Sequence, residues 1–584
     1  MPKITINGVE CEFEQGQKIL EVANNNSVKI PYYCYHDSLS IPAQCRICLG
    51  EVWAPNPRNE GKLEPQMGGK LQPTCSTEAA DGMVVYTDNP RAVANQKAVM
   101  EYLLINHPLD CPVCDQAGEC ELQDYSFEYG RGVSRFQETK VKQAKKDLGP
   151  NVYIYSDRCI MCTRCVRFTR EVAGTAELSI HGRGNKSEID VFPGVPLDNE
   201  ISANVIDLCP VGALLDKDFL FAQRVWFLKG TPSIDGITAS GDNITIEHNE
   251  GKVYRLKPRT NMAINRWWIT DEVRYGWKHI HEDRLETPYR RRFGALDACT
   301  FAQAYDEAIE GLKKAKDGGS KTLLIVSPML SCEDAYQLAK LADEIDPGAE
   351  FAVGHVPFRG EDKAFPKGAK PGDEGAFVMH AEKAPNARGV RRVLESFNKG
   401  VHDFDAAAKK LAAGEFGAAI VTGNYPGEWA DQSFADSLDN VFTVLIDTHQ
   451  RRVMDKADIV LTGATWAEKA GTFENAGNII QAFEQAVPVS ENSKPEAQIA
   501  IDMLSLLKGD RFGAVEKTVS RVDEAPGQVP TSVETRTQST RLYNAADTRS
   551  EMAHASASLG VFVTEVAMPV TDVQQEPDME MVEL

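Results

Sequence analysis

Long hydrophobic runs are missing from this 584-residue chain. The longest apolar run, residues 322–330, is far shorter than the roughly 20 residues that a helix needs to cross a bilayer. The opening sequence, MPKITINGVECEF, alternates apolar and polar residues and contains no apolar signal core. We therefore expect neither a signal peptide nor a transmembrane helix, so that any membrane association comes through partners.

Basic residues are in deficit. The chain has 63 Lys and Arg against 85 Asp and Glu, which gives a net charge of -22. This argues against nucleic acid as a partner, because a phosphate backbone is bound by a basic surface. No GxGxxG or GxxxxGK[ST] motif occurs, so neither NADH nor ATP binding is assigned to the chain.

Cysteine is concentrated in the N-terminal part. Eleven of the 14 cysteines, together with one histidine, form three sets of four. Thiolates at such spacing repel one another unless a metal neutralises them, and CxxC pairs without a secretion signal indicate metal sites in a reducing compartment rather than disulfides. The candidate ligands are Cys34, Cys45, Cys48 and Cys75 in the first set, His107, Cys111, Cys114 and Cys120 in the second, and Cys159, Cys162, Cys165 and Cys209 in the third.

The first set has the spacing C-x10-C-x2-C-x26-C. It resembles the ligand arrangement of plant-type [2Fe–2S] ferredoxins, although the first gap is longer here. A zinc site is the alternative, and the strand–helix pattern that precedes the set favours the cluster.

The second set, H-x3-C-x2-C-x5-C, suits either zinc or a [4Fe–4S] cluster. Two neighbouring cluster-like sets favour the cluster, and Pro112 and Gly118 supply turns for its loop. A neutral imidazole in place of a thiolate makes the cluster less negative, which on its own favours reduction.

The third set, C-x2-C-x2-C with Cys209 followed by Pro210, is the bacterial-ferredoxin signature of a [4Fe–4S] cluster. Its close spacing is cramped for tetrahedral zinc. The remaining cysteines, Cys11, Cys299 and Cys332, lie far apart and are expected to be small buried hydrophobes.

Two secondary-structure patterns divide the chain. The N-terminal part predicts a small mixed sheet beside a cysteine loop, with a hairpin turn at Asn7-Gly8, and a later helix that ends at His107. Beyond about residue 300, helices alternate with buried strands, as in a parallel α/β sheet. The predicted strands are 3–9, 11–14, 50–54, 83–87, 152–155, 243–248, 253–256, 322–327, 418–423, 441–447 and 458–463, and the predicted helices are 18–25, 91–107, 301–315, 332–345 and 403–413.

We interpret the chain as a multidomain α+β and α/β protein. Residues 354–390 predict a long loop or insertion, and the end of the chain predicts a largely disordered tail or a partner-wrapping arm, since its last fourteen residues carry five acids and no base. The predicted domains are a [2Fe–2S] ferredoxin-like domain (1–88), a [4Fe–4S] domain with one histidine and three cysteine ligands (89–140), a [4Fe–4S] ferredoxin-like domain (141–222), a β-rich domain without ligands (223–285), an α/β scaffold (286–523) and an acidic tail (524–584).

Four stretches carry a family resemblance. They are YYCYHDSLSIPAQCRICLGEV (32–52), HPLDCPVCDQAGECELQDYSFEYG (107–130), DRCIMCTRCVRFTREVAGT (157–175) and LCPVGAL (208–214). At these residues the chain resembles the large iron–sulfur subunit of respiratory complex I, the proton-pumping NADH:quinone oxidoreductase. The resemblance implies a plant-type β-grasp ferredoxin domain at the N-terminus.

The rest of the chain resembles the molybdopterin oxidoreductase fold, most clearly at residues 457–481. In that family the segment after residue 230 can hold a further cluster, but the matching positions here carry oxygen-bearing side chains. They are Asp235, Thr238, Asp242 and Thr270. We expect no fourth cluster, no molybdopterin and no catalytic site in this half, which the resemblance makes a degenerate scaffold.

The resemblance also implies a function. Electrons would arrive from a flavin-bearing, NADH-oxidising subunit, pass one [2Fe–2S] and two [4Fe–4S] clusters, and leave to a two-cluster ferredoxin-like subunit nearer the quinone, on the cytoplasmic side of the cell membrane. The alternatives are the iron–sulfur subunit of a soluble NAD-linked hydrogenase or formate dehydrogenase, and a zinc-stapled structural scaffold.

Overall fold

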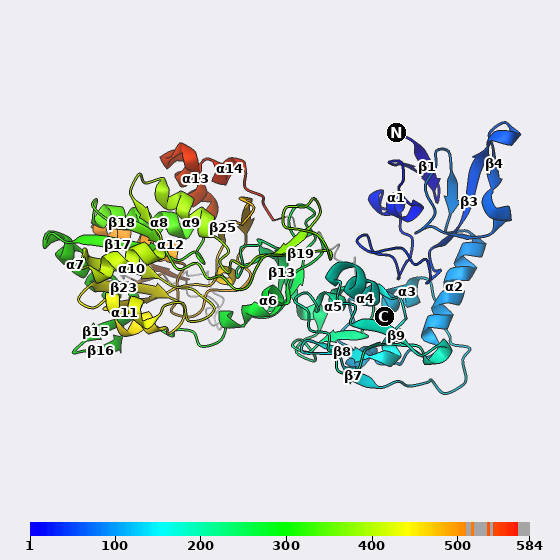
Figure 1. Ribbon diagram of the computed structural model, residues 1–584, viewed down its shortest axis with the longest axis horizontal. Coiled ribbons are helices and arrows are strands. Elements are labelled where there is room, and N and C mark those ends of the chain that lie inside the picture. The colour runs from blue at the N-terminus through cyan, green and yellow to red at the C-terminus, as the bar shows by residue number, and fades with distance from the viewer. Residues whose placement is uncertain (510–514, 519–533, 538–540, 570–584) are drawn as a thin grey trace, which may run out of the picture. The chain divides into compact units, whose positions relative to one another are not determined.

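The computed structural model describes residues 1–509, 515–518, 534–537 and 541–569, and Figure 1 gives its element labels. The chain divides into two compact units. The first contains residues 1–228 and 364–376, and the second contains the rest. The described residues include no helix with the length and apolarity needed to span a bilayer. The boundaries of the six predicted domains stay predictions.

The N-terminal sheet of the first unit begins with the predicted hairpin. Asn7 and Gly8 both have positive φ (49° and 84°), as a type I′ turn requires. The first strand then pairs in parallel with the sixth, which brings the chain back beside the cysteine loop. In spatial order the strands are β2 Val9–Glu12, β1 Lys3–Ile6, β6 Val84–Tyr86, β3 Leu49–Asn56 and β4 Lys62–Pro65, with β5 Gln72–Pro73 on β3 and α1 Ile19–Asn25 packed beside them.

The remainder of the first unit is built from short elements around cysteine loops. The helix predicted to reach His107 ends three residues earlier, at Leu104, so His107 lies in a loop. The strand predicted at 152–155 is confirmed. The elements are α2 Pro90–Leu104, α3 Glu121–Glu128, the sheet of β11 Leu214–Asp216, β8 Val152–Tyr155 and β7 Lys145–Asp147, the hairpin of β9 Leu178–His181 and β10 Glu188–Val191, α4 Arg164–Arg167 and α5 Asn204–Leu208.

The second unit begins with a three-stranded antiparallel sheet. Its apolar face packs against a short helix and against Trp466, Phe473 and Phe483 from far along the chain. The elements are β12 Lys229–Ile234, β13 Asn243–Asn249, β14 Lys252–Pro258 and α6 Asp271–Tyr275.

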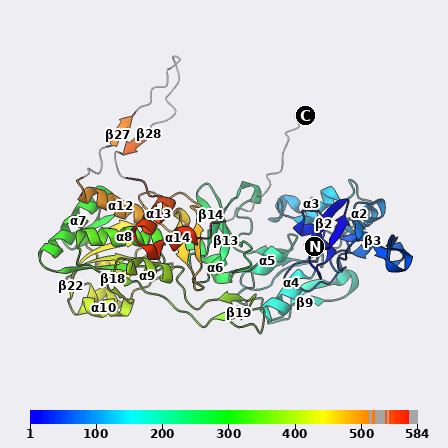
Figure 2. The same ribbon diagram turned by 90° about the horizontal axis from the view of Figure 1, so that it is seen from above.

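The predicted parallel α/β sheet is confirmed. Alternate residues of its strand 321–326 face opposite cores. Leu324 and Val326 pack with the helices 301–317, 332–345 and 496–507, whereas Leu323 and Ile325 pack with the helix 404–412 and with the region of the helix 432–437. Figure 2 shows the helices on the two faces. The strand order is β16 Ala295–Ala298, β15 Tyr289–Arg292, β24 Ile459–Thr462, β23 Phe442–Asp447, β22 Phe416–Thr422, β17 Lys321–Val326, β18 Glu350–Val353 and β21 Val401–His402. The helices are α7 Phe301–Asp317, α8 Cys332–Ile345, α9 Ala387–Glu395, α10 Phe404–Ala412, α11 Gln432–Ser437 and α12 Glu496–Leu507.

Two predictions about irregular segments need correction. Residues 354–390 are not all loop, because they contain β19 Lys363–Phe365, β20 Phe377–Met379 and the first residues of α9. The tail prediction is wrong for residues 541–569, which form α13 Ala545–Ala555 and α14 Val561–Thr564 and bury Met552, Leu559 and Phe562 against the α/β core. The last fourteen residues lie outside the described part of the chain. The remaining elements are β25 Gly471–Glu474 paired with β26 Ile480–Phe483, and β27 Val515–Thr518 paired with β28 Glu534–Thr537.

Candidate metal centres

The first set of thiols closes around one loop. Cys34, Cys45 and Cys48 lie between α1 and β3, and Cys75 follows β5. The Sγ atoms of Cys34 and Cys45 are 3.5 Å apart. Thr74 donates to the carbonyl of Cys48 at 2.9 Å, which ties the distant fourth thiol to the other three.

The electrostatics of the first set show thiols that compete for protons. A hydrogen bond from Cys45 lowers the pKa of Cys34, and one from Cys75 lowers the pKa of Cys48. The same hydrogen bonds raise the pKa values of the donors, Cys45 and Cys75, and burial raises them further. Iron or zinc would displace these shared protons, because metal ligands bind as thiolates.

The second set is carried by the loop between α2 and α3. Burial lowers the pKa of His107 to about 4, which keeps its imidazole in the neutral form that binds metal. Burial raises the pKa of Cys120 to about 11, whereas Cys111 is exposed. Arg224 donates to the carbonyl of Cys114 at 2.8 Å and holds the loop in place.

Gly118 in this loop meets both a conformational and a steric requirement. Its φ is +93°, and a Cβ there would lie 2.7 Å from a side-chain carbon of Val225. Glycine therefore allows both the turn and the close approach of residues 225–226 to the second set.

The third set lines one cavity. All four of its cysteines face this cavity, and the other lining side chains are mainly apolar, among them Ile154, Ile189 and Val211. Burial raises the pKa of Cys162 to about 11 and that of Cys159 to about 12. Left-handed backbone at Met161 and Thr163 (φ 53° and 63°) turns the chain between successive ligands.

Donor chemistry fits iron–sulfur clusters at all three sets, because each offers thiolates, with or without one imidazole. Every cysteine of the three sets is buried or half-buried except Cys111 of the second set, which is exposed. Within the described residues, no group of three His, Cys, Asp or Glu side chains is arranged to hold a single metal ion. Of the cysteines outside these sets, Cys11 and Cys332 are buried and Cys299 is half-buried.

The three sets converge on one hydrophobic core. This core contains ligands of every set: Cys34 and Cys45 of the first, Cys120 of the second, and Cys159, Cys162 and Cys209 of the third.

The third set lies between the other two. Gln44, next to Cys45, donates to the carbonyl of Met161 and to the hydroxyl of Thr163, each at 2.9 Å. On the other side, a Cβ on Gly212 would lie 2.2 Å from the Sγ of Cys114. The spatial order is therefore first, third, second, which the order of the motifs along the chain does not predict.

The segment of the third set contains three buried arginines whose burial was not predicted from the sequence. Arg158 bonds to Asp110 at 2.8 Å, Arg164 lies 3.5 Å from Glu121, and Arg167 donates to main-chain carbonyls. Their side chains are only 4–7% exposed. The stretch DRCIMCTRCVRF places arginines directly beside candidate ligand cysteines. Because those cysteines are expected to be buried, this pattern could have predicted that the arginines are buried too.

The segment after residue 230 does not fit a fourth cluster. Asp235, Thr238, Asp242 and Thr270 are all at most 2% exposed. The carboxylate of Asp235 accepts hydrogen bonds from the backbone of Thr238 (3.1 Å) and from its hydroxyl, and Thr270 caps α6. These four positions therefore carry oxygen-bearing side chains, and those of Asp235, Thr238 and Thr270 take part in local structure. Iron–sulfur clusters are held mainly by thiolates.

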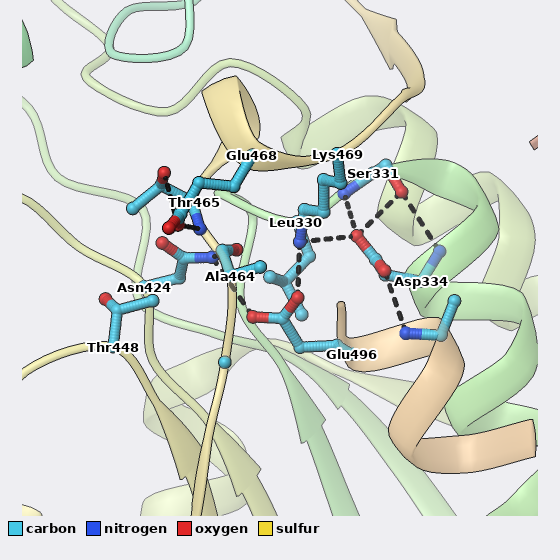
Figure 3. Close-up of polar contacts among 12 residues, drawn as sticks. Leu330, Ser331, Asp334, Asn424, Thr448, Ala464, Thr465, Glu468, Lys469 and Glu496 are labelled. Carbon is cyan, nitrogen blue, oxygen red and sulfur yellow. Dashed lines mark hydrogen bonds and ion pairs between the residues drawn. The ribbon is translucent and has the colours of Figure 1, made fainter. Parts of the chain in front are cut away.

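The carboxyl edge of the parallel sheet is filled by charged side chains. The chain runs from β17 to β18 on one side and returns to β22 on the other, and such a switch point is where α/β folds bind ligands. Here Lys469 Nζ lies 2.8 Å from Asp334 Oδ2 and also contacts Glu496 (Figure 3). All three side chains are at most 1% exposed. Because the protein's own ion network fills this place, the residues do not fit a pterin.

Five family models match the chain. "NADH-quinone oxidoreductase subunit 3, ferredoxin-like domain" matches residues 149–215, and "NADH-ubiquinone oxidoreductase-G iron-sulfur binding region" matches 96–135. "2Fe-2S iron-sulfur cluster binding domain" matches 2–90. "NADH-ubiquinone oxidoreductase NDSU1/NuoG-like, 4Fe-4S domain" matches 228–278, the cysteine-free segment, and "Molybdopterin oxidoreductase" matches 374–505.

Curated relatives are named as bacterial or mitochondrial subunits of NADH dehydrogenases that reduce quinone or ubiquinone. The G subunit of NADH-quinone oxidoreductase from Rickettsia felis is 37% identical over 59% of this chain and 49% of its own length. The chain thus spans about half the length of such relatives. NADH dehydrogenase [ubiquinone] iron-sulfur protein 1, mitochondrial, of Solanum tuberosum is 31% identical over 89% of this chain and 82% of its own length. A solved chain of an NAD+-reducing [NiFe]-hydrogenase matches 38% of this chain and 91% of its own, at 24% identity and a TM-score of 0.31. The chain therefore belongs to the family formed by the G subunits of NADH-quinone oxidoreductase and their mitochondrial counterparts.

Proposed function

We propose that the chain is an electron-relay subunit of NADH:quinone oxidoreductase, with one [2Fe–2S] cluster in the first set and one [4Fe–4S] cluster in each of the other two. The observation that carries the proposal is the convergence of all three ligand sets on a single hydrophobic core. Family membership supports the reaction.

When bound, the clusters supply one-electron carriers. The chain's own residues hold them close together and keep water away, since the cavity of the third set is lined mainly by apolar side chains. Neutral His107 completes the second set without adding negative charge. The contacts between neighbouring sets support a relay in the order first, third, second.

The finer assignments belong to the same proposal. The N-terminal sheet is a plant-type β-grasp ferredoxin domain, and the α/β half is a degenerate molybdopterin-type scaffold whose ligand position is filled by Lys469 and its partners. The donor of electrons is a flavin-bearing, NADH-oxidising subunit, and the acceptor is a two-cluster ferredoxin-like subunit. The complex lies on the cytoplasmic face of the cell membrane, and this chain reaches the membrane through its partners.

Co-purification tests the function. A tagged full-length chain isolated gently from its own cells should bring down NADH:quinone reductase activity from the membrane fraction. Hydrogenase or formate dehydrogenase activity in the same preparation, without quinone reduction, would assign the chain to the soluble NAD-linked enzymes instead.

A further inference from the structure

One guanidinium touches two ligand sets. Arg167 is the last residue of α4, two positions after Cys165, and is 7% exposed. Its Nη2 donates to the carbonyl of Cys34, a first-set ligand, and lies 3.5 Å from the carbonyl of Cys162, a third-set ligand. Its Nη1 donates to the carbonyl of Ser40 at 2.5 Å. The positive charge of Arg167 is therefore buried at the junction of the first and third sets.

The guanidinium of Arg167 differs from those of the two neighbouring buried arginines, because only carbonyl oxygens accept its hydrogen bonds. Arg158 and Arg164 each pair with a carboxylate, at 2.8 and 3.5 Å. For Arg167, no carboxylate in the described residues lies within ion-pair distance. Burial lowers the pKa of Arg167, and the nearby thiols of Cys162 and Cys34 oppose that shift. An arginine stays protonated even so.

A fixed buried cation favours any reaction that brings negative charge close to it. Reduction of a cluster adds one electron, and in surroundings of low dielectric the attraction to a cation a few ångströms away is poorly screened. Cluster potentials respond to net charge, to hydrogen bonds and to solvent exposure. We propose that Arg167 is a shared tuning residue that raises the reduction potentials of the first and third centres together. The difference between the two potentials, and so the free energy of electron transfer between the two centres, therefore stays small. This inference rests on the proposed function.

Glu171 provides a charge of opposite sign in the same place. Its carboxylate accepts hydrogen bonds from the backbone N–H of Ser40 at 2.9 Å and from the Ser40 hydroxyl at 2.5 Å. It thus binds the same residue as Arg167, and the two side chains interact electrostatically. Its negative charge offsets part of the effect of Arg167. Glutamine at this position would keep a hydrogen-bond acceptor for Ser40 and remove the charge.

The test is a redox titration followed by EPR on the full-length chain with its clusters reconstituted anaerobically. Arg167→Gln should lower the midpoint potentials of the [2Fe–2S] centre and of one [4Fe–4S] centre by a similar amount, with at least a tenfold loss of electron affinity, about 59 mV for a one-electron couple. Arg167→Lys should restore most of the shift. Glu171→Gln should move the same two potentials upward. Arg170→Gln, the same charge change at an exposed position of the neighbouring helical turn, should move neither.

The outcomes separate the two proposals. Suppose that the unaltered chain contains its clusters, but that Arg167→Gln changes neither midpoint potential or changes only one of them. This result overturns the tuning role and leaves the relay intact. If Arg167→Gln fails to assemble its clusters, the test rests on Glu171→Gln. A rise in both midpoint potentials of that variant supports the inference, and unchanged or lowered potentials overturn it. An unaltered chain without any EPR-active cluster overturns the relay and the tuning role together.

Discussion

Replacement of Lys469 by methionine leaves two buried carboxylates without their shared counter-charge. Asp334 keeps three other donors: the backbone and hydroxyl of Ser331 and the backbone N–H of Ala497. Glu496 keeps the side-chain amide of Asn424, at 3.1 Å, and its own backbone N–H. Because removal of one partner of a buried ion network costs about 3–5 kcal/mol, we expect a destabilisation of that size at neutral pH.

The destabilisation should depend on pH in a defined direction. Burial raises the pKa of Glu496 to about 7 in the folded protein, and Lys469 holds it below what burial alone would give. A raised carboxyl pKa means that the folded state holds a proton which the unfolded state has lost, so stability falls as the pH rises to that pKa. In the unaltered chain this fall ends near pH 7. In the variant it continues to higher pH, where the difference between the two proteins should grow by about 1.4 kcal/mol per pH unit.

Hydrogen–deuterium exchange measures this effect locally, because unfolding of a multidomain chain is not two-state. Peptides from α8 and α12 should lose protection in Lys469→Met, more at about pH 8 than at about pH 6. Lys340→Met is the matched control: Lys340 lies on α8, pairs with Glu551 at 2.5 Å and is 40% exposed, so its loss should cost less than about 1 kcal/mol. Equal effects of the two substitutions, or a Lys469→Met effect independent of pH, would refute the reasoning.

Three further predictions concern the metal centres. Cys162→Ala should remove one [4Fe–4S] signal and lower the iron content from about ten to about six per chain, whereas Cys299→Ala should change neither; unaltered iron in the first variant would contradict the ligand assignment. His107→Cys should keep its cluster but lower the midpoint potential, since a thiolate adds negative charge; an unchanged or raised potential in EPR titration would count against that argument. Gly212→Ala should disturb the second centre specifically, because its Cβ would lie 2.2 Å from the Sγ of Cys114, and the EPR signal of the first centre serves as the internal control.

Local signals predicted much of the first unit. Asn7-Gly8 fixes a hairpin because both residues adopt positive φ, and that conformation depends on a few consecutive residues alone. The spacing of the cysteines also predicts the three candidate ligand sets, because chelation by nearby cysteines constrains the chain locally, and the assignment of these residues as ligands stays a prediction. The alternation of apolar strands and helices likewise identified the parallel sheet of the second unit.

What the sequence did not predict depends on tertiary contacts. The central position of the third set follows from the approach of Gly212 to Cys114 and of Gln44 to Met161, which join residues far apart in the chain. The helix α13 was missed because it buries few side chains, two of them the polar Thr548 and Arg549, and so lacks apolar periodicity.

The most direct test of the account is the number and type of clusters in the anaerobically purified full-length chain. Iron and sulfide analysis combined with EPR during stepwise dithionite reduction should give about ten irons per chain, one two-iron signal and two four-iron signals. A colourless protein that contains about three zinc ions and gives no EPR signal after reduction would contradict the relay and make the three sets structural zinc sites.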